Sequence, residues 1–389
     1  MKSMGERRIV MLPGPTSVDP AVLRAMSRQI EPHSHPAFID KYKNVLEKLR
    51  KLIRTDGQVF AFAGSGTFSQ EVGVANFVEP GDKVLCLVNG FFSGRFVDMV
   101  KRRGGIPKVL EVPFGEGFTA EMVRKALKGA GFKAVTATHV ETSSGVVNPI
   151  DEIGEVVREE GALFIVDTVA SLGGMEVRQD EWGINVNCAC TQKCLGAPPG
   201  VSIVSLDKEA MEVLRKRETP ASTFYGDLKG WLPVIEDPYN NYRSTHPVSL
   251  IYALEEALNQ IFAEGLKKRY RRHKIIAEAF RKAMKAIGLK ILAKPGYESS
   301  TVTAVLYPEK CSIDDVEFRK EVERRKILIA YGYGPLRGKS FRVGHMGSVT
   351  ANDMLSTISA IEAALKKFGY KFRYGAGVTA AQKVLEKLR

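Results

Sequence analysis

Short apolar runs alternate with segments of helical spacing between about residue 58 and residue 205. Gly, Asp or Asn bounds many of these runs. The alternation predicts an α/β fold, with a mainly parallel central sheet flanked by helices and joined by right-handed crossovers. The expected strands are residues 59–62, 83–88, 108–112, 134–137, 162–166, 186–189 and 201–205, and the expected helices are residues 69–78, 94–103, 119–129 and 150–160.

The pattern changes after an apolar helical stretch at residues 250–263 and the basic helix that follows it. We therefore expect a smaller C-terminal α+β domain. Its predicted elements are a strand at 301–306, a helix at 313–325, strands at 327–331 and 340–343, and a helix at 350–368. The predicted division is an N-terminal segment of residues 1–16, a large domain of residues 17–263 and a small domain of residues 264–389.

The composition fits a protein with a large core, since the chain has 389 residues of which 44% are hydrophobic. The start lacks the apolar core of a signal peptide, and no apolar run is long enough to span a bilayer. We expect a cytoplasmic protein without a membrane partner. The net charge of +13 and the basic run at 267–274 raise the possibility of nucleic-acid binding. That run lies in a helical pattern, however, and abundant Lys, Arg and Glu are typical of surface charge in a thermophile, so we expect no nucleic-acid partner.

The five cysteines argue against a disulfide framework, because their number is odd. Three of them form a C-x-C-x3-C pattern that lacks a fourth ligand nearby, so we expect core and loop thiols and no metal site. The cysteines are Cys86, Cys188, Cys190, Cys194 and Cys311.

Polar and ionisable residues follow three of the predicted strands. Asp167 ends one apolar run, Lys193 follows another, and a third leads into His139 and Glu141. Because the carboxyl ends of parallel strands meet at one edge of a sheet, these groups could surround a single ligand. Taken singly, Lys193 could be a surface lysine and Asp167 a helix cap.

A loop from Gly64 to Thr67 joins the first strand to a helix and supplies backbone N–H groups and hydroxyls suited to phosphate. Alone it could be an ordinary turn. With an acid and a lysine at neighbouring strand ends, it completes the parts needed for pyridoxal phosphate. Lys193 can form an imine with the aldehyde and shuttle a proton, and Asp167 can keep the pyridine nitrogen protonated.

At these residues the chain resembles the class V branch of fold-type I aminotransferases, the alanine-glyoxylate and serine-pyruvate aminotransferase group. The resemblance covers nearly the whole chain, and the order and spacing of its motifs are highly specific. The motifs are Leu12-Pro13-Gly14-Pro15-Thr16, Gly64-Ser65-Gly66-Thr67, Asn89-Gly90, the segment 139–145, the segment 167–174, the segment 192–200 and Phe341-Arg342-Val343-Gly344.

The resemblance implies a role for each matching residue. Lys193 and Asp167 are the implied catalytic residues in the large domain. Arg342 would bind the substrate carboxylate, with Gly14 also on the substrate side. The implied cofactor-binding residues are Ser65, Gly66, Thr67 and Gln192 at the phosphate, Phe92 on the ring, Ser143 near the phenolic oxygen, and Tyr242 and Thr245, which reach the phosphate of the neighbouring subunit in a homodimer.

Two positions depart from the family pattern and bear on substrate preference. Phe92 stands where many members have Trp, and Thr67 where some have His. No second basic cluster is expected in the pocket beside Arg342. His139 is expected either behind the cofactor-contacting residues or as a structural histidine with satisfied hydrogen bonds.

The resemblance implies a transaminase that moves the amino group of serine or alanine to glyoxylate or pyruvate. Aspartate, phosphoserine and aminoethylphosphonate stay open as substrates, because the loop around His33 and His35 could also line the pocket. A cysteine desulfurase using Cys311 is an alternative, although Gln192 replaces the histidine of the desulfurase pattern before the lysine. A non-catalytic regulator that binds the cofactor is another.

Overall fold

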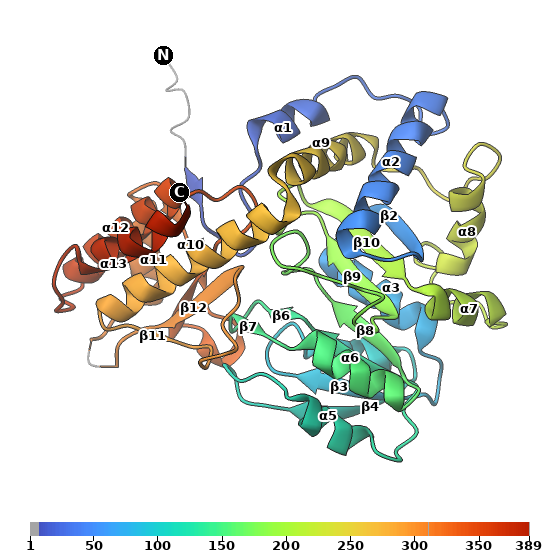
Figure 1. Cartoon of the computed structure of the whole chain (residues 1–389), viewed down its shortest axis with the longest axis horizontal. Coiled ribbons are helices and arrows are strands. Elements are labelled where there is room, and N and C mark those ends of the chain that lie inside the picture. Colours follow the sequence, from blue (N-terminus) through green and yellow to red (C-terminus); the bar gives the residue numbers. More distant parts are fainter. Residues whose placement is uncertain (1–7, 310, 389) are drawn as a thin grey trace.

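The computed structural model describes residues 8–309 and 311–388 and contains a broad α/β body and a smaller body beside it (Figure 1). Within those residues, no helix is both long enough and apolar enough to cross a membrane. The broad body is built on a seven-stranded sheet of order β2-β10-β9-β8-β5-β3-β4. Its strands are β2 (Gln58–Gly64), β3 (Lys83–Val88), β4 (Ile106–Glu111), β5 (Ala134–Thr138), β8 (Leu163–Asp167), β9 (Val186–Cys190) and β10 (Gly200–Leu206).

The sheet is mainly parallel, as predicted, but β10 runs antiparallel to both of its neighbours, β2 and β9. The last residues of β2, β5, β8 and β9 therefore still lie at one edge. Every residue of β5, β8 and β9 is buried. Burial on both faces explains why these strands are continuous apolar runs in the sequence.

Helices cover both faces of this sheet. Because successive strand residues point to opposite faces, Val59 and Ala61 pack in one core and Phe60 and Phe62 in the other. The first core is covered by α2 (Pro36–Ile53), α5 (Ala120–Leu127), α6 (Ile150–Glu159) and α9 (Val248–Glu264). The second is covered by α3 (Gly66–Phe77), α4 (Arg95–Arg102), α7 (Lys208–Lys216) and α8 (Leu228–Glu236), while α1 (Pro20–Met26) packs on α9.

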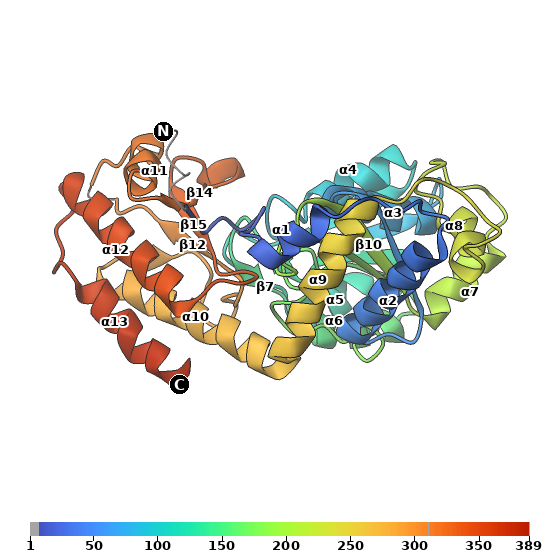
Figure 2. The same cartoon turned by 90° about the horizontal axis from the view of Figure 1, so that it is seen from above.

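The smaller body contains a four-stranded sheet of order β11-β12-β15-β14, with antiparallel pairing. Its strands are β11 (Lys290–Ile291), β12 (Val302–Leu306), β14 (Ala330–Tyr331) and β15 (Ser340–Gly344). The helices are α10 (Leu266–Ala286), α11 (Asp315–Glu323), α12 (Ala351–Lys367) and α13 (Ala376–Leu385), with short 3₁₀ turns at Gly334–Leu336 and Glu386–Leu388. The C-terminal helix α13 lies along α10 (Figure 2).

The predicted strand at residues 327–331 is divided in the structure. β13 (Ile327–Leu328) pairs in parallel with the N-terminal strand β1 (Ile9–Val10), whereas β14 pairs with β15. Ile329 lies between the two short strands and is buried. One apolar run therefore serves two sheets. A further hairpin joins β6 (Val140–Glu141) to β7 (Val146–Val147).

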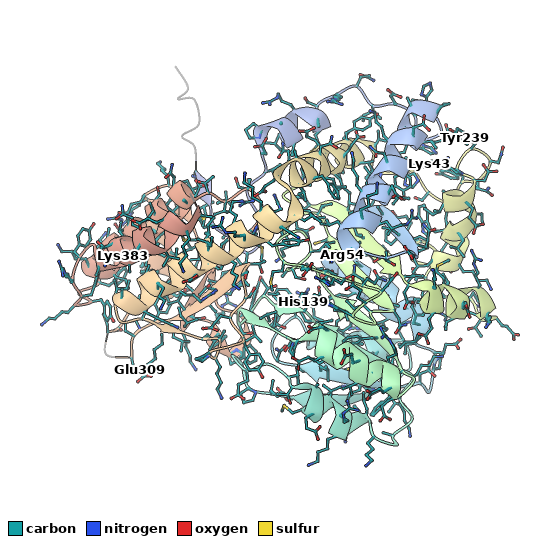
Figure 3. The ribbon with its side chains drawn as sticks, viewed as in Figure 1. Lys43, Arg54, His139, Tyr239, Glu309 and Lys383 are labelled. Carbon is teal, nitrogen blue, oxygen red and sulfur yellow. The ribbon has the colours of Figure 1, made fainter. Side chains whose placement is uncertain are left out.

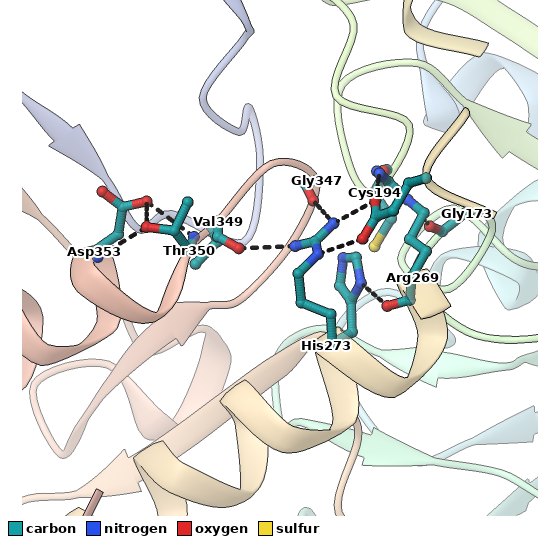
Figure 4. A network of polar contacts seen from close by, with 10 residues as sticks. Gly173, Cys194, Arg269, His273, Gly347, Val349, Thr350 and Asp353 are labelled. Carbon is teal, nitrogen blue, oxygen red and sulfur yellow. Dashed lines mark hydrogen bonds and ion pairs between the residues drawn. The ribbon is translucent and has the colours of Figure 1, made fainter. Parts of the chain in front are cut away.

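The basic run that suggested nucleic acid lies in α10, and part of it is internal. Arg269 is buried, and both Arg269 and Arg272 pair with Glu264 at the end of α9. Arg272 also donates to the carbonyl oxygens of Gly347 and Val349 (Figure 4). These contacts join α10 to the end of α9 and to the loop of residues 347–349 in the smaller body. The domain division after residue 263 stays a prediction.

Candidate active site

A cavity of about 200 Å³ lies at the sheet edge where β2, β8 and β9 end. It brings together most of the residues expected there from the sequence. The predicted residues that line it are Gly14, Ser65, Gly66, Thr67, Phe92, Asp167, Gln192 and Lys193. Six further residues line it: Pro15, Thr142 and Val169, which belong to the family motifs but had no predicted role, and Gln70, Arg95 and Tyr333, which lie outside the motifs.

Asp167 is a buried carboxyl group at the end of β8. Oδ1 accepts from the backbone N–H of Val169 at 2.7 Å, and Oδ2 accepts from Nε2 of Gln70 at 2.6 Å. Burial raises the pKa of Asp167 to about 7. Both of these hydrogen-bond partners are neutral, so a cationic ring nitrogen in the cavity would supply the missing opposite charge.

The amino group of Lys193 donates a hydrogen bond to the carbonyl oxygen of Pro13. Nζ lies 5.8 Å from the centroid of the Phe92 ring. Burial lowers the pKa of Lys193, which favours the neutral amine that acts as a nucleophile. Gly14 passes directly against this side chain, since a Cβ at Gly14 would lie 2.7 Å from Nζ.

The glycine loop forms the N-terminus of α3. Ser65 caps this helix by accepting from the N–H of Phe68, and the helix begins at Gly66 rather than near Ser69. A Cβ at Gly66 would come within 2.8 Å of Val169. The first N–H groups of a helix lack intrahelical partners and attract anions. Oε1 of Gln192, also on the cavity wall, is buried and has no partner among the described residues.

These observations fit pyridoxal phosphate. The cavity offers an anion-binding helix N-terminus, a lysine whose pKa is lowered, and a buried acid without a cationic hydrogen-bond partner. These are the groups that a phosphate, an aldehyde and a pyridine nitrogen require.

Ser143 lies outside the lining residues and anchors the loop that carries Phe92. Its hydroxyl donates to Oε1 of Glu141 at 2.6 Å and accepts from the N–H of Phe91 at 3.0 Å. Glu141 also accepts from the N–H groups of Phe92 and Ser93. The loop is therefore fixed by one buried carboxylate.

Arg342 lies directly behind the cavity wall. It donates to the carbonyl oxygens of Tyr331 and Thr142, and its guanidinium carbon is 4.4 Å from the centroid of the Tyr333 ring. Burial lowers the pKa of Arg342. Tyr333 lines the cavity and Arg342 does not. The role of Arg342 at a substrate carboxylate therefore stays a prediction.

Tyr242 and Thr245 lie away from this cavity. Their hydroxyls are 3.2 Å apart. Tyr242 is 66% exposed, and the centroid of its ring is 5.3 Å from that of His33. His35 caps α2. Neither His33 nor His35 lines the cavity of the same chain.

Arg95 supplies a basic group that sequence analysis had not placed in the pocket. Nη1 donates to the hydroxyl of Thr67 at 2.8 Å, and the guanidinium lies 4.8 Å from the centroid of the Phe92 ring. Arg95 follows Phe92 by three residues and begins α4, and this spacing was the sequence signal that could have placed it in the pocket. Gln70 is likewise three residues after Thr67 on α3.

Two alternatives lose support from side-chain positions. The interpretation of His139 as a structural histidine with satisfied hydrogen bonds loses support, because Nδ1 is buried without a partner in the described part of the chain. Figure 3 labels His139 in the broad body. The thiol of Cys311 donates to the carbonyl oxygen of Phe368 and does not line the cavity. The other four cysteines are buried.

Comparison with known proteins identifies the same family as the sequence motifs. The family model described as "Aminotransferase class-V" matches residues 13–333. The L-aspartate–glyoxylate aminotransferase of Paracoccus denitrificans is 34% identical, over 97% of this chain and 96% of that protein. The serine–glyoxylate aminotransferase of Methylorubrum extorquens is also 34% identical, over 98% and 96%. The crystal structure of the ureidoglycine–glyoxylate aminotransferase from Bacillus subtilis has a TM-score of 0.94 and 32% identity, over 99% of this chain and 100% of that one.

Proposed function

Since the chain belongs to the class V aminotransferase family and is a transaminase, we propose that it transfers the amino group of a small L-amino acid to glyoxylate or pyruvate, using pyridoxal phosphate. The observation that carries the proposal is the convergence of Lys193, Asp167 and the N-terminus of α3 on one cavity. When bound, the cofactor supplies an aldehyde that accepts the amino group and a ring that withdraws electrons.

The residues of the cavity divide this work. Lys193 holds the aldehyde and afterwards moves a proton from the substrate α-carbon, a task that its lowered pKa favours. Asp167 would keep the ring nitrogen protonated, and Phe92 would contact the ring. Ser65, Gly66, Thr67 and Gln192 bind the phosphate.

We further propose a homodimer with shared sites. Tyr242 and Thr245 are both exposed and do not line the cavity of their own chain. In a dimer, these two residues of one subunit would complete the phosphate site of the other. Ser143 would act near the phenolic oxygen of the cofactor through the loop that it anchors.

The amino acceptor is better supported than the amino donor. The three relatives named above share glyoxylate in their names but differ in the amino donor, so we propose glyoxylate as the preferred acceptor. Serine or alanine is the proposed donor, with Arg342 at its carboxylate. Arg95 favours a second candidate, L-aspartate, because it adds a cation to the cavity wall for a second carboxylate.

The absorption spectrum of the purified protein tests these proposals. We expect a visible band with pyridoxal phosphate that is bleached by the true donor among L-serine, L-alanine and L-aspartate and restored by glyoxylate. Lys193→Ala should abolish the restored band and the turnover. A protein that stays colourless with added cofactor, or whose band and turnover survive Lys193→Ala, would refute the assignment.

A further inference from the structure

The residues predicted to bind the cofactor phosphate carry no charge. They are Ser65, Gly66, Thr67 and Gln192, and the two hydroxyl groups expected from the neighbouring subunit are neutral as well. The N-terminus of α3 adds about half a positive charge. A phosphate monoester carries about −1.5 to −2 charges at pH 7, so these groups leave most of its charge unbalanced. A cation at this end of the cavity would therefore strengthen the binding of the phosphate.

Arg95 supplies a cation at this end. Lys193 and Arg95 are the basic residues that line the cavity, and Lys193 is the one proposed to hold the aldehyde. Nη1 of Arg95 donates to Oγ1 of Thr67 at 2.8 Å, and Thr67 is the second residue of α3. This contact holds the guanidinium beside the helix N-terminus that attracts anions. No carboxylate among the described residues forms an ion pair with Arg95, so its charge is available to a ligand.

Two aromatic rings also contact the guanidinium of Arg95. Its central carbon lies 4.8 Å from the centroid of the Phe92 ring and 5.1 Å from that of Phe91. A guanidinium that stacks on a ring keeps its N–H edges free for hydrogen bonds. The loop that carries both rings is fixed by Glu141, which accepts from the N–H groups of Phe92 and Ser93. Arg95 is therefore oriented by the protein itself, which lowers the entropic cost of binding an anion.

We propose that Arg95 is the principal cationic ligand of the cofactor phosphate. This inference rests on the proposed function, since it requires pyridoxal phosphate in the cavity. The N–H groups that Thr67 does not use would donate to phosphate oxygens, a role that suits the planar guanidinium. The phosphate and the second carboxylate of L-aspartate are alternative partners for one guanidinium, and the contact with Thr67 favours the phosphate.

Binding of pyridoxal phosphate and of pyridoxal, which lacks the phosphate, tests the proposal. The full-length protein is freed of cofactor by dialysis, and the visible band that develops during titration gives a dissociation constant for each ligand. In Arg95→Met, we expect the constant for pyridoxal phosphate to rise about tenfold or more, and that for pyridoxal to change by less than about threefold. Arg95→Lys, which keeps the charge, should lose less affinity than Arg95→Met.

The holoenzyme provides a second readout that needs no cofactor-free protein. Release of the cofactor after dilution should be faster in Arg95→Met by about the factor that its affinity falls. Arg102→Met is the matched control for both measurements, since Arg102 is exposed on the same helix and does not line the cavity. We expect this variant to bind both ligands as the wild type does.

The two ligands separate a contact with the phosphate from an effect on packing. Equal weakening of both ligands in Arg95→Met would mean that Arg95 acts through Phe92, and this result would overturn the proposal. Unchanged affinity for pyridoxal phosphate would overturn it as well, and a higher KM for L-aspartate in that case would assign Arg95 to the second carboxylate. A wild-type protein that binds neither ligand would instead refute the proposed function itself.

Discussion

Nη2 of Arg269 donates a hydrogen bond to the carbonyl oxygen of Cys194 at 2.8 Å, one residue beyond Lys193. Nε of the same guanidinium donates to the carbonyl oxygen of Gly173 at 2.7 Å. One buried cation of α10 therefore holds the loops that follow β8 and β9, the strands that lead to Asp167 and Lys193 (Figure 4). Glu264 balances its charge.

Arg269→Ala should lower the free energy of unfolding by about 2–4 kcal/mol, because it leaves two buried carbonyl groups and Glu264 without this partner. Urea denaturation monitored by circular dichroism measures the change. Arg271→Ala is the control, since Arg271 is an exposed residue of the same helix and should change stability by less than about 1 kcal/mol. Equal losses in the two variants would refute the structural role of Arg269.

Gly14→Ala should reduce turnover far more than Gly81→Ala. Both glycines have positive φ, +122° and +90°, so each substitution carries backbone strain of about 1–2 kcal/mol. Only at Gly14 does the new methyl group meet Lys193, with Cβ 2.5 Å from its Cδ, whereas nothing lies within 4 Å of the corresponding position at Gly81. Steady-state kinetics and thermal melting together separate the two effects. Similar turnover in both variants would show that contact with Lys193 is unimportant.

The stability of the cofactor-free protein should fall relative to Asp167→Asn as pH rises from about 4 to 7. The pKa of Asp167 is raised by burial from 3.8 to about 7, so the folded state binds the extra proton in this window. That contribution is complete below pH 4 and is lost as pH rises through 7, by at most about 4 kcal/mol. Urea denaturation at a series of pH values measures the difference. A constant difference between the two proteins would contradict the raised pKa.

Arg342→Lys should raise the KM for the amino donor by about 10- to 100-fold, because lysine lacks the planar pair of donors that matches a carboxylate. Initial rates at varied donor concentration give KM and kcat separately. Arg337→Lys is the control, since Arg337 is exposed and lies 5.9 Å from the centroid of the Tyr331 ring. An unchanged KM would refute a role of Arg342 in binding the donor carboxylate and would limit it to its contacts with Tyr331 and Thr142.

Mixing two inactive variants should restore activity if the sites are shared between subunits. A dimer of one Lys193→Ala subunit and one Tyr242→Ala subunit would contain one site with both changes and one site with neither. After random exchange of subunits, about a quarter of the wild-type activity should return. Rates before and after unfolding and joint refolding measure the recovery. No recovery, with dimers formed, would place Tyr242 at the site of its own chain or at none.

The strand ends were predictable from sequence because a strand buried on both faces is a continuous apolar run, and the residue that ends it is conspicuous. Asp167 and Lys193 were found in this way, and the structure places both at one cavity. The positions of Gln70 and Arg95 depend on how α3 and α4 are rotated against the sheet, which the apolar pattern defines only coarsely. The division of residues 327–331 was missed because β13 pairs with β1, more than 300 positions earlier in the chain.

The pairing of β1 with β13 makes the N-terminal segment a tether between the smaller body and the reactive amine. Its far end is bound to the lysine loop, where Thr16 donates from its hydroxyl to the carbonyl oxygen of Lys193 and from its N–H to that of Gln192. Pro13 accepts from the amine itself. A displacement of the smaller body would strain these contacts. We therefore expect the conformation of the Lys193 side chain and the position of β13 to be thermodynamically linked, so that a change in one alters the other.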